Sequence, residues 1–189
     1  MADAPSWDWL GDDLAVDLAN TVRRRRDREA ELIGGPAELA AWLGHEAGRV
    51  PVPAQVDAGL VRRFLELRDH ALAVLRAAAA GAPLPNDAVA AINATAQATP
   101  AVRLLGDRAG TSALRVPHAA DDAEALLGLL AAAVIDLAAR PAAGGVALCD
   151  APSCGQLFLR TRADQRWCGP GCGNRARAAR HHARAADAR

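Results

Sequence analysis

The sequence predicts a mainly α-helical protein that carries a small cysteine-rich module at its C-terminal end. Alanine fills 48 of the 189 positions, whereas the chain has only 2 Phe, 4 Trp and no Tyr. Alanine is the strongest helix former, and it is depleted in strands. Apolar residues recur with the 3.6-residue period of an amphipathic helix through most of the body of the chain. All four cysteines lie between Cys149 and Cys172.

Five helices are predicted in the body. The longest shows the helical period clearly at Leu60, Phe64 and Leu67, and Gly81 is a natural end for it. Asn86 is a good N-cap for the helix that follows, and the acidic run from Asp121 resembles a capping box. The predicted helices span residues 10–22, 37–46, 54–80, 87–98 and 124–139. Two short apolar segments, 102–105 and 113–116, predict one β-hairpin.

The charged stretch at residues 23–31 allows two interpretations, a phosphate-binding site or a solvated helix. The run Arg23–Arg26 could bind phosphate, but Asp27, Glu29 and Glu31 dilute its charge. The mixture favours a solvated, charged helix.

Charge and cysteine usage divide the chain into two domains. The formal net charge is zero, but residues 149–189 hold 8 Arg and 3 Asp, giving +5, so residues 1–148, with 14 Arg and 19 acidic residues, carry −5. Residues 141–145 consist of proline, alanine and glycine, and we expect them to form a short flexible linker. We predict domains at 1–143 and 144–189.

The chain predicts a cytoplasmic protein with no membrane association. Its first ten residues lack the features of a signal peptide. The longest uncharged apolar run, 125–135, is about half of the roughly 20 residues that a membrane span requires. In a reducing compartment disulfides are disfavoured, so the cysteines need another explanation.

The cysteine spacing predicts a structural zinc site. The pairs Cys149-x4-Cys154 and Cys168-x3-Cys172 are separated by thirteen residues, long enough for a two-stranded hairpin. Glycines around the cysteines allow the backbone to turn tightly. A unit of about forty residues has too small a core to be stable alone, and a bound metal ion would stabilise it. Four thiolates leave no open position for a catalytic water. Two disulfides, four unrelated thiols or an iron–sulfur cluster are the alternatives.

The residues after the last cysteine predict a basic helix that begins near Cys172. Arg177, Arg180, His181 and Arg184 form one stripe at i, i+3, i+4 and i+7. A second stripe of small residues could pack on the finger: Ala176, Ala179, Ala183 and Ala186. Arginine forks match phosphates and guanine edges, so the helix is a candidate reader of nucleic acid. A solvated face, or a face that docks on the acidic body, is the alternative.

One polar group in the body predicts a small ligand pocket. Asp17, Asn20 and Thr21 share a helix face at i, i+3 and i+4. Asn and Thr also favour helix ends, so a simple helix terminus is the competing reading. The sequence offers no catalytic constellation, and we expect the protein not to be an enzyme.

Several strings resemble known bacterial domains. Arg166-Trp167-Cys168, followed by Cys172-Gly173-Asn174-Arg175, resembles the CGNR-type zinc finger. Residues 14–21 resemble the opening of the ABATE domain that precedes this finger, and 36–43 resemble its next helix. Arg160 stands where many relatives have an acidic residue, and Arg177 where many have Lys.

The resemblance implies a stress-induced transcription regulator with a treble-clef-like four-cysteine finger. One Zn²⁺ per chain would be held by Cys149, Cys154, Cys168 and Cys172. The finger would bind nucleic acid, DNA more than RNA, while the helical domain senses a small-molecule effector or forms a homodimer. The alternative is a zinc-stapled ligand-binding or protein-interaction module without nucleic-acid binding. The expected phosphate contacts are Arg162, Arg166, Arg177, Arg180 and Arg184, with Asn174 and Arg175 bracing the finger or approaching the nucleic-acid backbone.

Overall fold

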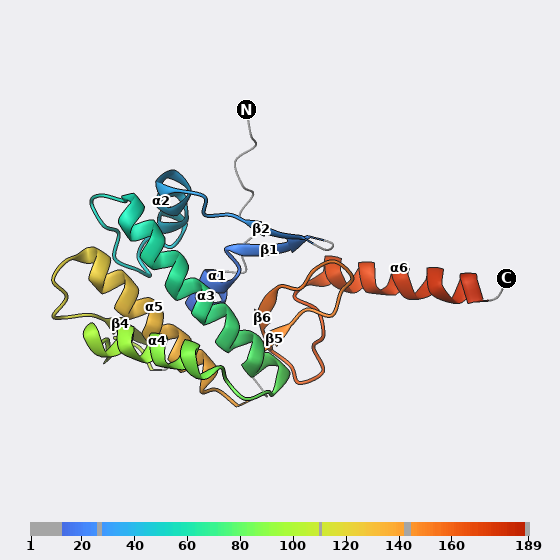
Figure 1. Ribbon diagram of the computed structural model, residues 1–189. Coiled ribbons are helices and arrows are strands. Elements are labelled where there is room, and N and C mark those ends of the chain that lie inside the picture. The colour runs from blue at the N-terminus through green and yellow to red at the C-terminus, as the bar shows by residue number, and fades with distance from the viewer. Residues whose placement is uncertain (1–12, 26–27, 110, 142–144, 188–189) are drawn as a thin grey trace.

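The computed structural model describes residues 13–25, 28–109, 111–141 and 145–187 (Figure 1). The described part is mainly helical, with three separate two-stranded antiparallel sheets. Its helices are α1 (Leu14–Ala19), α2 (Pro36–His45), α3 (Ala58–Ala80), α4 (Asn86–Ala98), α5 (Asp122–Ala138) and α6 (Pro170–Asp187). Its strands are β1 (Val22–Arg25), β2 (Arg28–Glu31), β3 (Val102–Leu105), β4 (Ser112–Arg115), β5 (Val146–Leu148) and β6 (Leu157–Leu159).

Aspartate caps fix where three of the helices begin. The carboxylate of Asp13 accepts from the amide of Ala15 at 3.0 Å, so α1 begins at Leu14, and residues 10–12 of the predicted helix lie outside the described residues. Asp57 caps α3 in the same way and sets its start four residues later than predicted. Asp121 caps α5 as the capping-box pattern indicates. The predicted cap Asn86 instead occupies the first turn of α4.

The main core lies between α1, α3 and α5. Every residue of the short helix α1 is buried. The ring of Trp42 from α2 meets that of Phe64 from α3 edge to face, with centroids 5.1 Å apart. Figure 1 shows α3 running through the middle of the body with α4 and α5 along one side. None of the helices in the described ranges combines the length and the hydropathy that a membrane span requires.

The charged stretch at 23–31 is not the solvated helix that the sequence predicts, because β1 and β2 form an antiparallel hairpin there. Residues two apart share a face of a strand but not of a helix. Glu29 and Glu31 therefore both reach α3, where Glu29 pairs with Arg76 at 2.8 Å and Glu31 with Arg68 at 2.6 Å. Burial opposes ionisation of Glu31, but the hydrogen bonds and charge of Arg68 lower its pKa overall.

The hairpin predicted around residues 102–116 is present as β3 and β4, paired from Val102 with Arg115 to Leu105 with Ser112. Arg103 on β3 forms an ion pair with Asp136, which ties the hairpin to α5.

The C-terminal finger packs against the body through its own hairpin. We predicted a hairpin between the two cysteine pairs, but its strands β5 and β6 flank the first pair instead. Val146 and Leu157 explain this, since their buried side chains join the main core of the body. Residues 161–164, by contrast, are all exposed. The predicted boundary after residue 143 falls at 142–144, outside the described residues.

Candidate metal centre and nucleic-acid interface

The first cysteine pair sits on the turn that joins β5 to β6. Cys149 follows β5 directly, and the amide of Cys154 donates to the carbonyl of Ala151 at 3.1 Å. Ser153 and Gly155 adopt left-handed backbone conformations, with φ of 61° and 65°. Two such residues around Cys154 curl the chain, so that both sulfurs point to one side.

The second pair brackets the start of α6. Cys168 precedes the helix, and Cys172 lies in its first turn behind Pro170, a favourable first residue for a helix. A Cβ atom on Gly173 would lie 3.3 Å from the Trp167 ring, so the small residue allows this ring to pack closely on the helix. Because Cys168 and Cys172 lie at the N-terminal end of α6, the positive end of the helix dipole faces their sulfurs and favours the ionised form.

The four sulfurs fit a tetrahedral zinc ion. All four lie within 4.8 Å of one another, with Cys154 and Cys168 3.8 Å apart and Cys168 and Cys172 3.5 Å apart. Four Zn–S bonds of about 2.3 Å give a tetrahedron with edges of about 3.8 Å. All four cysteines are free, and these separations are far longer than the roughly 2.05 Å of a disulfide bond.

Thiols this close cannot all ionise without a cation. The hydrogen bond from Cys168 lowers the pKa of Cys154 to about 5. The same hydrogen bond, with burial, raises the pKa of Cys168, and burial raises the pKa of Cys172 to about 11. One thiolate therefore suppresses the next, and a bound divalent cation would relieve this repulsion.

Arg175 links the loop of the first cysteine pair to the second pair. Its Nη1 donates to the carbonyl of Pro152 at 3.2 Å, and its Nη2 lies 3.6 Å from the sulfur of Cys172. The amide of Cys168 also lies 3.4 Å from the sulfur of Cys149. Such N–H groups orient the sulfurs and stabilise their negative charge.

Helix α6 leaves the finger and extends away from the body (Figure 1). Arg177, Arg180 and Arg184 are exposed on it. Arg177 donates to the side chain of Asn174 one turn earlier, and the guanidinium of Arg180 lies 5.8 Å from the centre of the Trp167 ring. These contacts hold two of the arginines close to the finger while their charge stays open to solvent.

The prediction that an alanine stripe packs α6 onto the finger is wrong beyond the first member. Ala176 is 8% exposed, whereas Ala179 and Ala183 are exposed. The side chain of Ala186 lies outside the described residues. The finger covers only the first two turns of the helix, because its own core is a small group around the cysteines and Phe158.

Arg162 and Arg166 have acidic partners within the finger. Arg166 pairs with Asp150 at 3.0 Å, and Arg162 with Asp164 at 3.6 Å. Both arginines remain mostly exposed, so phosphates would compete with weak surface pairs there.

Asp17, Asn20 and Thr21 are buried, but they have different neighbours. Asp17 accepts from Arg49 Nη1 at 2.7 Å, and Glu46 accepts from the same nitrogen at 2.7 Å. Burial, with the nearby charge of Asp17, raises the pKa of Glu46 to about 7. Sequence reasoning missed Arg49 and Glu46, because nothing in their local pattern distinguishes them from surface residues.

Asn20 joins the body to the finger. Its side-chain amide donates to the carbonyl of Leu157 at 2.9 Å and accepts from the amide of the same residue at 3.1 Å. Thr21 donates to the carbonyl of Leu18 and accepts from Arg68 at 3.1 Å. The polar groups of Asn20 and Thr21 thus serve contacts within the protein.

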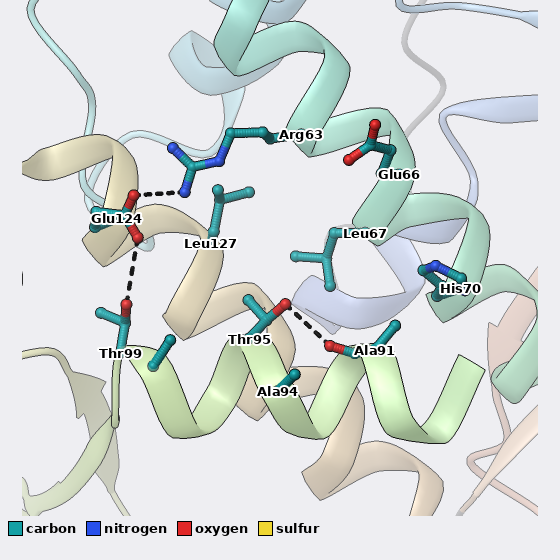
Figure 2. A pocket seen from close by; sticks show the side chains of 11 residues that line it. Arg63, Glu66, Leu67, His70, Ala91, Ala94, Thr95, Thr99, Glu124 and Leu127 are labelled. Atoms are coloured by element: carbon teal, nitrogen blue, oxygen red, sulfur yellow. Dashed lines mark hydrogen bonds and ion pairs between the residues drawn. The ribbon is translucent and has the colours of Figure 1, made fainter. Parts of the chain in front are cut away.

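A groove of about 350 Å³ lies between α3, α4 and the start of α5 (Figure 2). Arg63 and Glu124 pair across it at 2.5 Å, and Thr99 also reaches Glu124. Figure 2 shows Glu66 and His70 on α3 at the opposite end from this pair. The arginine and one of the carboxylates that line this groove thus neutralise each other.

Comparison with known families agrees with both halves of the chain. The ABATE family, described as "Putative stress-induced transcription regulator", matches residues 12–141. The CGNR zinc finger matches residues 146–185, which include all four cysteines and most of α6. No curated protein matches the sequence. The ABATE match alone covers more than half of the chain, and the protein is therefore a member of the ABATE family that carries a CGNR zinc finger.

Proposed function

We propose that this protein is a transcriptional regulator whose finger binds DNA, with Cys149, Cys154, Cys168 and Cys172 holding one structural Zn²⁺. The proposal rests chiefly on α6, which begins at the cysteines, is exposed from Arg177 to Arg184 and has no acidic residue before Asp187. Bound zinc would fix the fold of the finger, and Arg175 would hold its loop.

The shape of α6 favours duplex DNA as the partner. Its 18 residues make a rod of about 27 Å. A helix with its side chains is about 10–12 Å wide, which suits the major groove of B-form DNA, roughly 12 Å across. The major groove of duplex RNA is too narrow for such a helix. Arg177 and Arg184 lie two turns apart on one face, where they could reach phosphates or guanine edges.

We also propose that the helical body supplies the regulatory input, by ligand sensing or by dimerisation. The hydrogen bonds between Asn20 and Leu157 support this proposal, because they join the body to β6, the strand that follows the first cysteine pair.

The DNA proposal predicts a strong salt dependence. We expect the zinc-loaded protein to bind duplex DNA in fluorescence anisotropy, with affinity falling steeply as salt rises, because each neutralised phosphate releases counterions. Replacing Arg177 and Arg184 with Ala should weaken binding and lower the salt slope by about one to two. Replacing Arg62 and Arg108, two exposed arginines of the body, is the matched control and should change little.

Two results would contradict this function. One is a zinc-loaded protein that fails to bind DNA at low salt. The other is an equal loss of affinity in the α6 variant and the body variant, which would show that binding depends on total charge rather than on this helix. Either result would favour the interaction module without nucleic-acid binding.

A further inference from the structure

Two adjoining cavities form a groove on the body, between the segment that follows α2, the strand β4 and the helix α5. Their volumes are about 400 and 460 Å³. Both are lined by Gly48, Arg49, Arg115 and Leu129, so they meet along a shared wall. A groove of this size is in the range that holds a small organic molecule.

Arg49 presents part of its guanidinium to this groove. Both of its hydrogen bonds to carboxylates, those to Asp17 and Glu46, use Nη1. The side chain keeps 37% of its surface exposed. The buried carboxylates therefore fix the guanidinium in place, and its outer edge is available for a planar, two-oxygen anion.

Arg115 supplies a second cation to the same wall. It is exposed at the end of β4, and its Nη1 donates to the carbonyl of Leu114 at 3.2 Å. Within the described residues no carboxylate lies within ion-pair distance of it.

The acidic residues of the groove do not favour a cationic ligand. Asp13 pairs with Arg140 at 3.2 Å, and Asp136 pairs with Arg103. The remaining aspartate, Asp122, lies at the exposed start of α5. Arg103 and Arg140 are thereby paired as well, and Arg49 is held by Asp17 and Glu46. Arg115 is therefore the arginine of this groove that has no carboxylate partner among the described residues.

Apolar residues also line the groove. Leu129 is 3% exposed, Leu14 and Ala133 are 9% exposed, and Leu114 and Val116 are half-buried. A ligand that satisfies both these apolar residues and the arginines must combine an apolar body with an anionic head.

We propose that this groove is an effector site for a small organic acid, whose carboxylate is held by Arg49 and Arg115 and whose apolar body rests on Leu129 and Ala133. The inference rests on the sensing role proposed above and gives that role a location. Arg49 contacts Asp17 on α1, and Asn20, the residue that follows this helix, holds the finger. The acid therefore binds one side chain away from the helix that positions the metal centre.

The test measures binding by calorimetry on the full-length, zinc-loaded protein in the absence of DNA. The probes are benzoate, phenylacetate and octanoate, each compared with its neutral amide. We expect at least one acid to bind saturably and about tenfold more tightly than its amide, since a charge-assisted hydrogen bond contributes about that much.

Arg115→Gln should weaken binding of that acid by about tenfold, because it removes one of the two cations that hold the carboxylate. The fold should not change, because the side chain of Arg115 is exposed. Arg108→Gln, which removes an equal charge from the turn of the same hairpin, is the control and should bind normally. The site would be refuted if no acid in the panel binds, if amide and acid bind equally, or if Arg115→Gln changes nothing. Because DNA is absent, these outcomes are independent of whether the finger binds DNA.

Discussion

Arg49 is the residue on which a buried carboxyl pair depends. Asp17 is fully buried and Glu46 is 3% exposed, yet one guanidinium nitrogen serves both. Two carboxylates this close to a single cation do not both ionise readily. Burial and the charge of Asp17 raise the pKa of Glu46 to about 7, although Arg49 opposes the shift.

This pair predicts a pH-dependent stability. The pKa of Glu46 in the folded state lies above its unfolded value of 4.5, so the folded state binds the extra proton. The free energy of unfolding should therefore fall as pH rises from about 5 to 7, by up to about 1 kcal/mol per pH unit, and level off above this range.

Glu46→Gln should remove this slope, because glutamine keeps the size and polarity of the side chain but does not titrate. The measurement is urea unfolding of both proteins at several pH values, using the difference between them so that other titrations cancel. Parallel pH profiles for the two proteins would show that Glu46 does not carry a raised pKa.

Individual residues also show what could be read from the sequence. The four cysteines were predictable because their spacing alone implies a shared ligand, and the structure brings their sulfurs together. The role of Asn20 was not, because its partner Leu157 lies 137 positions away and only the folded chain places the two side by side. Arg68 was equally hidden, since one buried arginine looks like any of the others in the sequence.

At the scale of elements, Asn20 acts as a short substitute for a strand. It pairs with both the amide and the carbonyl of Leu157, as a neighbouring strand would, at the edge of the β5–β6 hairpin. Both groups are buried, so losing their partner costs more than one exposed hydrogen bond. This contact, with the core side chains Val146 and Leu157, sets the position of the finger on the body.

Asn20→Ala should loosen β6 without unfolding the body. We expect amide hydrogen exchange at Leu157 to accelerate by about tenfold or more. Without its partner, the free energy needed to open this amide to solvent falls by roughly 1–3 kcal/mol. Asn93→Ala, at an exposed asparagine of α4, is the matched control and should leave that amide unchanged. Unchanged exchange at Leu157 in Asn20→Ala would mean that the apolar contacts alone position the finger.

Helices and hairpins differed in how far the sequence predicted them. The helical period of α2, α3, α4 and α5 identified those helices, and only their ends shifted where an aspartate or proline capped them. The β1–β2 hairpin was missed because its charges resemble a solvated helix. Its strand form depends on Glu29 and Glu31 meeting Arg76 and Arg68 on α3, which are distant in sequence.

At the scale of the whole molecule, the body and the finger share one core while α6 stands apart. Val146 and Leu157 of the finger lie in the main core, whereas the cysteines and Phe158 form a second, smaller cluster. Helix α6 contributes Cys172 to this second cluster and contacts the finger through Gly173 and Arg175. Its exposed turns contribute little burial, so we expect its order to depend on the metal centre rather than on the body.

This arrangement predicts a partial unfolding when zinc is removed. Chelation should abolish the helical signal of α6 in far-UV circular dichroism. Without a bound ion to join their sulfurs, the four cysteines no longer hold the first turn of this helix. The body should stay helical but melt at a lower temperature. If the finger loosens, Val146 and Leu157 no longer cover the core of the body, and part of its apolar surface becomes exposed to water. Zinc, but not Mg²⁺, should restore both signals, and Cys172→Ser should reproduce the chelated state without chelator. A spectrum that does not change on chelation would contradict a structural zinc, while complete loss of helix would show that the body cannot fold without its finger.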